Sequence, residues 1–85
     1  MNPRYVYKKI KVGDTIRITT KEAVGVIGTV LDIDMSEDGI EIQGLKDTKL
    51  LEQIDNAMEF ETAIFPITDI KYIFKLKLDE LKPKE

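Results

Sequence analysis

At 85 residues the chain has room for one domain with a single hydrophobic core, and its hydrophobic (42%) and charged (34%) contents are those of an ordinary globular protein. No apolar run approaches the roughly 20 residues of a transmembrane helix, and the beginning, MNPRYVYKKIK, lacks the apolar stretch of a signal peptide, so we expect a cytoplasmic protein with no membrane partner. Cysteine and histidine are absent, which excludes disulfides and removes the usual general base and the commonest metal ligand, and we predict a non-enzyme without cofactor or metal.

The net charge of −3 is unevenly distributed along the chain. Residues 1–21 carry six basic side chains against one acid, residues 22–69 carry twelve acids against two lysines, and residues 70–85 carry five lysines against three acids. This order predicts separate basic and acidic surfaces, the basic one able to meet phosphate or an acidic protein. The same charges are also consistent with a solvated surface on which they neutralise one another.

The first predicted strands follow from alternation and from glycine. Residues 10–18, IKVGDTIRI, alternate apolar and polar side chains around a Gly-Asp turn, which predicts a strand begun through a tight turn. Residues 19–24 show neither the two-residue period of a strand nor the 3.6-residue period of a helix, which predicts a loop. Residues 24–33, VGVIGTVLDI, are β-branched and contain Gly25 and Gly28, which predicts a strand that bends sharply or is closely approached by another backbone.

A hairpin and a helical insertion are predicted next. SEDG at residues 36–39 has the composition of a turn, and GIEIQG at 39–44 alternates again, so it is predicted to pair with the preceding strand. Residues 46–59 place apolar side chains at helical spacing behind a possible N-cap at Asp47 or Thr48, which predicts a helix of about three turns. Its apolar positions are Leu50, Leu51, Ile54 and Met58.

Two strands complete the predicted fold. Residues 60–64 alternate before Pro66, and residues 70–78, IKYIFKLKL, predict a long half-buried strand, while residues 79–85 are expected to fray. The predicted buried face of the last strand comprises Ile70, Tyr72, Phe74, Leu76 and Leu78. Residues 1–85 are thus predicted to form one mainly β domain, a small five-stranded SH3-like or Sm-like barrel with one short helical insertion near 46–59. A flat sheet backed by that helix is the alternative.

Residues 12–38 resemble the KOW motif, which occurs in transcription elongation factors of the NusG type and in several ribosomal proteins. The positions that carry the resemblance are Gly13-Asp14, Ile16, Ile18, Gly25, Gly28, Val30 and Ile33-Asp34. Lys21 departs from the pattern, since it stands near the point where the motif often has a loop glycine. The resemblance implies an SH3-like barrel that makes its contacts through the loop after the first strand and through neighbouring basic and aromatic residues.

Candidate binding residues combine that implication with the basic beginning of the chain. They are Tyr5, Tyr7, Lys8, Lys9, Lys11, Arg17, Thr20 and Lys21. A base can stack on a tyrosine ring while ammonium groups meet phosphates, although tyrosines at such positions are more often ordinary strand residues. Because the sequence pI is about 5.0, bulk charge alone does not predict binding to nucleic acid. The glycines Gly13, Gly25 and Gly28 are assigned a structural role in shaping the bent strand.

One further pattern is superficially like a calcium loop. Residues 32–39, DIDMSEDG, alternate oxygen-bearing side chains, but the sixth position is not glycine and the distant bidentate glutamate is missing. We therefore interpret this segment as a hairpin turn with solvated acids.

These observations predict a small non-enzymatic binding module whose partner is RNA or an RNA-associated protein of transcription or translation. The contacts are expected from the 19–24 loop and the N-terminal basic residues. The alternative is a protein-interaction or inhibitory accessory protein of a phage or mobile element, using the acidic middle and the 46–59 segment. A third possibility is an Sm-like ring-former. The apolar face of 46–59 is most simply a cover for the core, and if the barrel is already closed that face needs a partner, which could be a second copy of the chain.

Overall fold

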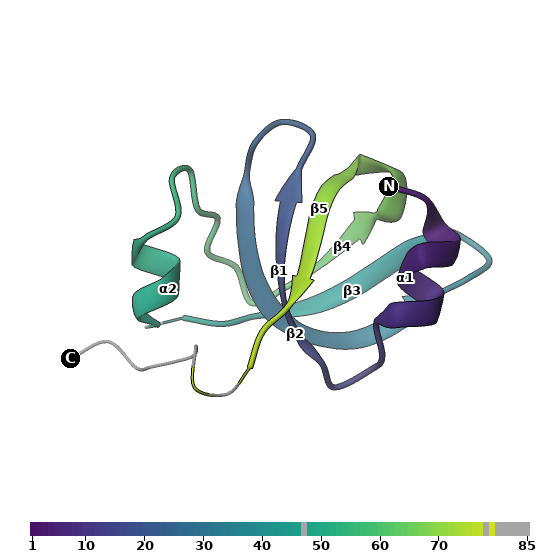
Figure 1. Ribbon diagram of the computed structural model, residues 1–85, viewed down its shortest axis with the longest axis horizontal. Coiled ribbons are helices and arrows are strands. Elements are labelled where there is room, and N and C mark those ends of the chain that lie inside the picture. Colours follow the sequence, from purple (N-terminus) through teal and green to yellow (C-terminus); the bar gives the residue numbers. More distant parts are fainter. Residues whose placement is uncertain (47, 78, 80–85) are drawn as a thin grey trace.

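One antiparallel sheet organises the chain in the computed structural model, which describes residues 1–46, 48–77 and 79 (Figure 1). Within those residues the strand order is β4-β3-β2-β1-β5. The strands are β1 (Thr15–Thr20), β2 (Gly25–Asp34), β3 (Gly39–Gly44), β4 (Thr62–Pro66) and β5 (Ile70–Lys75). The predicted mainly β, five-stranded character is therefore confirmed. No helix in the described ranges is both long and apolar enough to cross a membrane.

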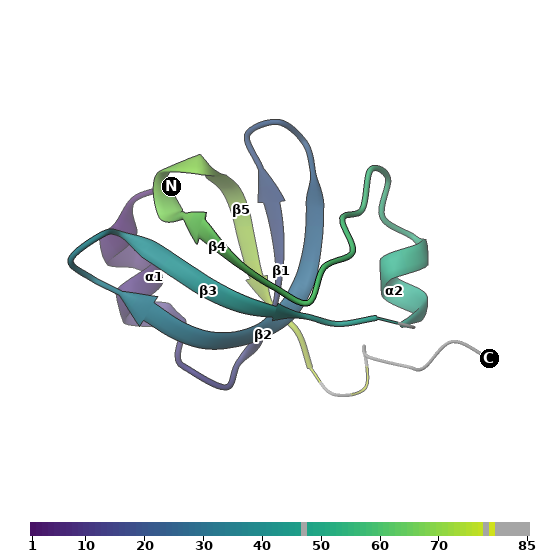
Figure 2. The same cartoon turned by 180° about the vertical axis from the view of Figure 1, so that it is seen from behind.

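β2 is the strand that curves the sheet. Its first half pairs with β1, from Gly25 opposite Thr19 to Thr29 opposite Thr15, and its second half pairs with β3. The register with β3 shifts between Val30 and Asp32, where a bulge adds local twist. Figures 1 and 2 show β2 as a long curved strand with the other strands wrapped around its inner side. The predicted hairpin of β2 and β3 is confirmed.

The core lies on the inner side of the curled sheet and consists mainly of β-branched side chains. Alternation along β1, β2 and β3 directs every second residue inward, as strand geometry requires. The buried cluster comprises Val6, Ile10, Ile16, Ile18, Val26, Val30, Ile40, Ile42, Ile67, Ile70 and Ile73. Ile67 belongs to the short 3-10 helix η1 (Ile67–Asp69), which joins β4 to β5 and closes the core at that end.

Close backbone approaches occur at two glycines of β2. A Cβ on Gly25 would overlap the side chain of Ile54, and the backbone of Gly25 exchanges hydrogen bonds with Asn56 and Met58. A Cβ on Gly28 would overlap both the side chain of Ile42 and the carbonyl of Gln43. Both positions therefore lack the space for a larger residue, which is the circumstance in which glycine is required inside a strand.

The N-terminal segment corrects the interpretation of Tyr5 and Tyr7 as strand residues. Residues Pro3–Lys9 form helix α1, which begins with Asn2 as N-cap, its side chain accepting a hydrogen bond from the Arg4 amide, and with proline at the start. Val6 is completely buried in the core, as is Ile10 just after the helix. Seven residues are too few for helical periodicity to appear in the sequence, and the Asn-Pro start was the one local signal; packing against η1 and the core holds the segment as a helix.

The predicted helix over 46–59 is wrong in length. The observed α2 spans Lys49–Glu52, with Thr48 as N-cap: its Oγ1 accepts from the Leu51 amide at 3.2 Å. Asp47, the other predicted cap, lies outside the described residues. The rest of the segment is held in non-helical form because Gly25 bonds to the backbone of residues 56 and 58. Leu51 and Ile54 cover Ile27 on the outer side of the sheet.

β5 buries different side chains from those predicted. Ile70 and Ile73 face the core, whereas Tyr72 and Phe74 are 50% and 57% exposed. The cause is a register shift: Thr19 pairs with Tyr72 but Thr20 pairs with Ile70, so Lys71 is an extra residue in β5. One extra residue reverses the alternation and moves the aromatic rings to the outer face. Of the other predicted positions, Leu76 is half-buried and Leu78 lies outside the described residues.

Candidate binding surfaces

The candidate residues predicted from the sequence lie in three separate places. Tyr5, Tyr7, Lys8 and Lys9 belong to α1, and Lys11 follows it in the turn toward β1. Arg17 lies in the middle of β1, and Thr20 and Lys21 lie at the β1–β2 loop (residues 20–24). Figure 1 shows α1 beside the β2–β3 turn, while the β1–β2 loop projects from another part of the sheet. The α1 residues therefore belong to a different surface from the loop.

Tyr7 has a partner inside the protein. Its hydroxyl donates a hydrogen bond to the Asp38 carboxylate, across the β2–β3 turn, and the Met35 carbonyl oxygen lies 3.4 Å from the same hydroxyl. The hydrogen bond to Asp38 is the main reason why the pKa of Tyr7 is raised from 10.0 to about 12. Tyr7 thus ties α1 to the hairpin, and its hydroxyl is engaged in structure.

This contact predicts a pH dependence. A raised pKa in the folded state means that the contribution of Tyr7 to stability is complete below pH 10 and is lost as the pH rises from 10 toward about 12. We expect tyrosinate absorbance to show a titration near pH 12 that is missing in Tyr7→Phe and moves to lower pH in Asp38→Asn. Titration at the same pH in Asp38→Asn and in the wild type would contradict the assigned cause.

The β2–β3 turn is organised by one aspartate. Asp34 Oδ1 accepts hydrogen bonds from the Ser36 amide at 3.0 Å, the Ser36 hydroxyl at 2.7 Å and the Glu37 amide at 3.2 Å. The hydroxyl of Ser36 is the first cause of a lowered pKa at Asp34, because these donors favour the charged carboxylate. Among the described residues no group of three or more carboxylate, thiol or imidazole side chains is arranged to hold a metal ion.

An acidic hollow of about 240 Å³ occupies the outer side of the same hairpin. It is lined by Asp32, Asp34, Glu37, Gly39, Glu41 and Ile64. Four of the twelve acids of residues 22–69 therefore gather over β2, the β2–β3 turn and β3. Ile64, in β4, is an exposed apolar residue at the edge of this acidic hollow.

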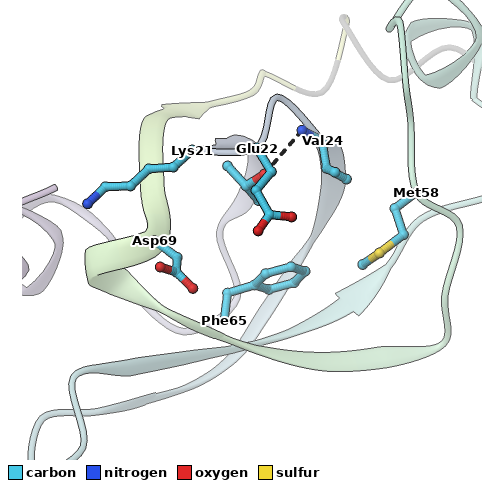
Figure 3. A pocket seen from close by; sticks show the side chains of 7 residues that line it. Lys21, Glu22, Val24, Met58, Phe65 and Asp69 are labelled. Carbon is cyan, nitrogen blue, oxygen red and sulfur yellow. Dashed lines mark hydrogen bonds between the residues drawn. The ribbon is translucent and has the colours of Figure 1, made fainter.

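A pocket of about 250 Å³ lies beneath the β1–β2 loop (Figure 3). Its lining combines the loop residues Thr20, Lys21, Glu22 and Val24 with Met58, Phe65 and Asp69. The loop is fixed by its own hydrogen bonds: the Val24 amide donates to Thr20 Oγ1 at 3.1 Å, and the Lys21 amide donates to the Asp69 carbonyl at 2.8 Å. Two predicted residues, Thr20 and Lys21, therefore form part of a preformed pocket.

The outer face of β5 and β1 carries a second candidate surface, which we call the aromatic face: Tyr72, Phe74, Lys71 and Arg17. The rings of Tyr72 and Phe74 are stacked, with centroids 6.4 Å apart and an interplanar angle of 21°. The Lys71 ammonium lies 5.4 Å from the Tyr72 ring centroid. Arg17 is directly opposite Phe74 in the neighbouring strand, so both side chains share this face.

The aromatic face also has defined borders. Across β1, Arg17 is opposite Ile27 of β2. Ile27 is covered by Leu51 of α2 and by Ile54 just after it, and we call residues 49–54 the α2 segment. At the end of β5, Lys75 Nζ lies 3.3 Å from a carboxylate oxygen of Asp14. The α2 segment therefore covers the β2 side of the outer face and leaves the β5 side open to solvent.

No protein-family model, curated protein or solved structure matches this chain.

Sequence reasoning missed Tyr72 and Phe74 as binding candidates although a signal was present. Residues 71–75, KYIFK, interleave aromatic and basic side chains in the same way as residues 5–9, YVYKK. Strand alternation assigned the rings of residues 72 and 74 to the core, and the bulge that reverses them depends on pairing with β1. The pocket residues Phe65, Met58 and Asp69 come from separate segments that no local pattern connects.

Proposed function

We propose that this chain is a small SH3-like binding module and that it binds single-stranded RNA on the aromatic face. In the strand order β1 lies between β2 and β5, and a 3-10 helix joins β4 to β5. Both features support the SH3-like assignment. Residues 12–38, which resemble the KOW motif, span β1, β2 and the turn that follows.

The observation that carries the proposal is a pair of stacked, half-exposed aromatic rings beside cationic side chains. Exposed aromatic rings that lie next to each other mark a candidate interaction site. Single-stranded nucleic acid is a suitable ligand for them because every base has a face that stacks on an aromatic ring. Lys71 and Arg17 lie where they can meet the phosphates of the stacked nucleotides. The protein as a whole is acidic, so this binding rests on a local surface and on stacking more than on long-range attraction.

Anisotropy titrations with a labelled oligouridine of about ten nucleotides test the proposal. Stacking is worth about 1–3 kcal/mol per base, so Tyr72→Ala with Phe74→Ala, which removes two stacking rings, is expected to weaken binding by about thirtyfold or more. Two phosphate contacts, from Lys71 and Arg17, predict a shallow salt dependence, with log K falling by about 1.4 per decade of salt.

Tyr5→Ala provides the matched control, because Tyr5 is 49% exposed but belongs to α1, away from the aromatic face. Its affinity for the oligouridine should equal that of the wild type. A second comparison, Lys8→Glu with Lys9→Glu, tests the basic surface predicted from the sequence. Loss of binding in the lysine variant together with full binding in the Tyr72→Ala, Phe74→Ala variant would reject the aromatic face as the RNA site.

A further inference from the structure

We propose that the pocket beneath the β1–β2 loop receives an arginine side chain from a partner protein. This site is separate from the aromatic face and does not depend on RNA binding. Its floor and walls are apolar: Phe65, Met58 and Val24 all pack partly against the core and also line the pocket. Phe65 is held by an edge-to-face contact with Phe60, the centroids being 5.8 Å apart at 71°.

The charge around the pocket selects the ligand. Figure 3 shows the Glu22 carboxylate above the Phe65 ring and the Asp69 carboxylate on the other side of the Phe65 side chain, whereas the ammonium of Lys21 extends away from the pocket. An anion would therefore meet two carboxylates, and a neutral apolar group would leave them unused. A cation with an apolar stem matches both the ring and the carboxylates.

Arginine fits this combination better than lysine. A planar guanidinium can stack on an aromatic ring while its N–H donors, which lie in the plane of the guanidinium, point toward carboxylates at the edge of the ring. An ammonium is a more strongly hydrated point charge. The volume of about 250 Å³ lies below the roughly 300–1,000 Å³ of sites that enclose small molecules, which favours a single long side chain presented by a larger partner.

The pocket is also preorganised. The β1–β2 loop makes a closed turn, in which the Ala23 amide donates to the Thr20 carbonyl at 2.9 Å and the Thr20 amide donates to the Val24 carbonyl at 2.9 Å. The bond from Lys21 to the backbone of Asp69 attaches this turn to η1. Because both carboxylate-bearing segments are already held together, binding needs little ordering of the chain, which lowers its entropic cost.

An NMR titration of the whole protein tests the proposal with N-acetyl-arginine methylamide as the probe. We expect saturable shifts at the Met58 methyl, the Phe65 ring and the Lys21 amide. The neutral isostere N-acetyl-citrulline methylamide should bind at least tenfold more weakly, because its urea group lacks the positive charge. Equal responses to the two probes would overturn the proposal, and tighter binding of N-acetyl-lysine methylamide would overturn the choice of arginine.

Variants separate the pocket from other acidic surfaces. Glu22→Gln with Asp69→Asn removes both charges, and since both side chains are exposed and Asp69 bonds to Lys21 through its backbone, the fold should be retained. This variant should lose at least tenfold in affinity for the arginine probe, whereas Glu41→Gln, in the acidic hollow, should bind as the wild type does. Equal losses in both variants would show non-specific attraction and reject the pocket. Tyr72→Ala should keep the arginine response, which distinguishes this site from the RNA surface.

Discussion

Gly28→Ala is expected to destabilise the protein by about 3 kcal/mol or more, a large fraction of the total for a domain of this size. The new Cβ would overlap the side chain of Ile42 and the carbonyl of Gln43 in β3. A side chain can rotate away, but the carbonyl belongs to the paired backbone of β2 and β3, so relief requires the two strands to separate. Urea unfolding followed by circular dichroism would measure the loss as a lower midpoint.

Gly39→Ala is the matched control for this prediction, because Gly39 lies in the same hairpin and is also buried. A Cβ there would contact Ile64 Cγ2 at 3.4 Å, an ordinary van der Waals distance. We expect a change within about 1 kcal/mol, of either sign, since alanine also reduces the freedom of the unfolded chain. Equal destabilisation by the two substitutions would show that the loss of glycine, and not the close approach of β3, determines the result.

Val6→Asp is expected to have an effect of similar size. Val6 is 0% exposed and belongs to the same buried cluster as the strand residues Ile16 and Ile18, so a carboxylate there would be removed from water without a partner. We expect a loss of about 3 kcal/mol or more, enough to unfold a marginally stable domain, visible as a lower melting temperature.

Tyr5→Asp makes the comparison specific, because it introduces the same charge one position earlier on the exposed side of α1. Its melting temperature should remain within a few degrees of the wild type. If Val6→Asp were tolerated as well as Tyr5→Asp, α1 would not be part of the core. The N-terminal segment would then be a basic arm outside the core.

The candidate site could be predicted only in part. Sequence patterns could predict the β1–β2 loop with Lys21, because a break in periodicity between two strands marks a loop and loops often carry contacts. They could also predict Arg17, because it occupies an outer position of a strand. Lys21 does line a pocket and Arg17 does share a face with exposed aromatic rings. The remaining members, such as Phe65 and Tyr72, depend on which strands become neighbours.

The sequence by itself determined the order of five strands and the hairpin of β2 and β3, because alternating side chains and turn residues act over a few neighbouring positions. It placed the first strand over residues 10–18, whereas β1 spans Thr15–Thr20. Only the tertiary structure decided that residues 3–9 are helical, that α2 is one turn long and that Tyr72 and Phe74 face solvent. The physical reason is common to all three. A bulge opposite β1, a hydrogen-bonded approach to Gly25 and a buried contact of Val6 each join segments far apart in the chain, and such contacts override local preference.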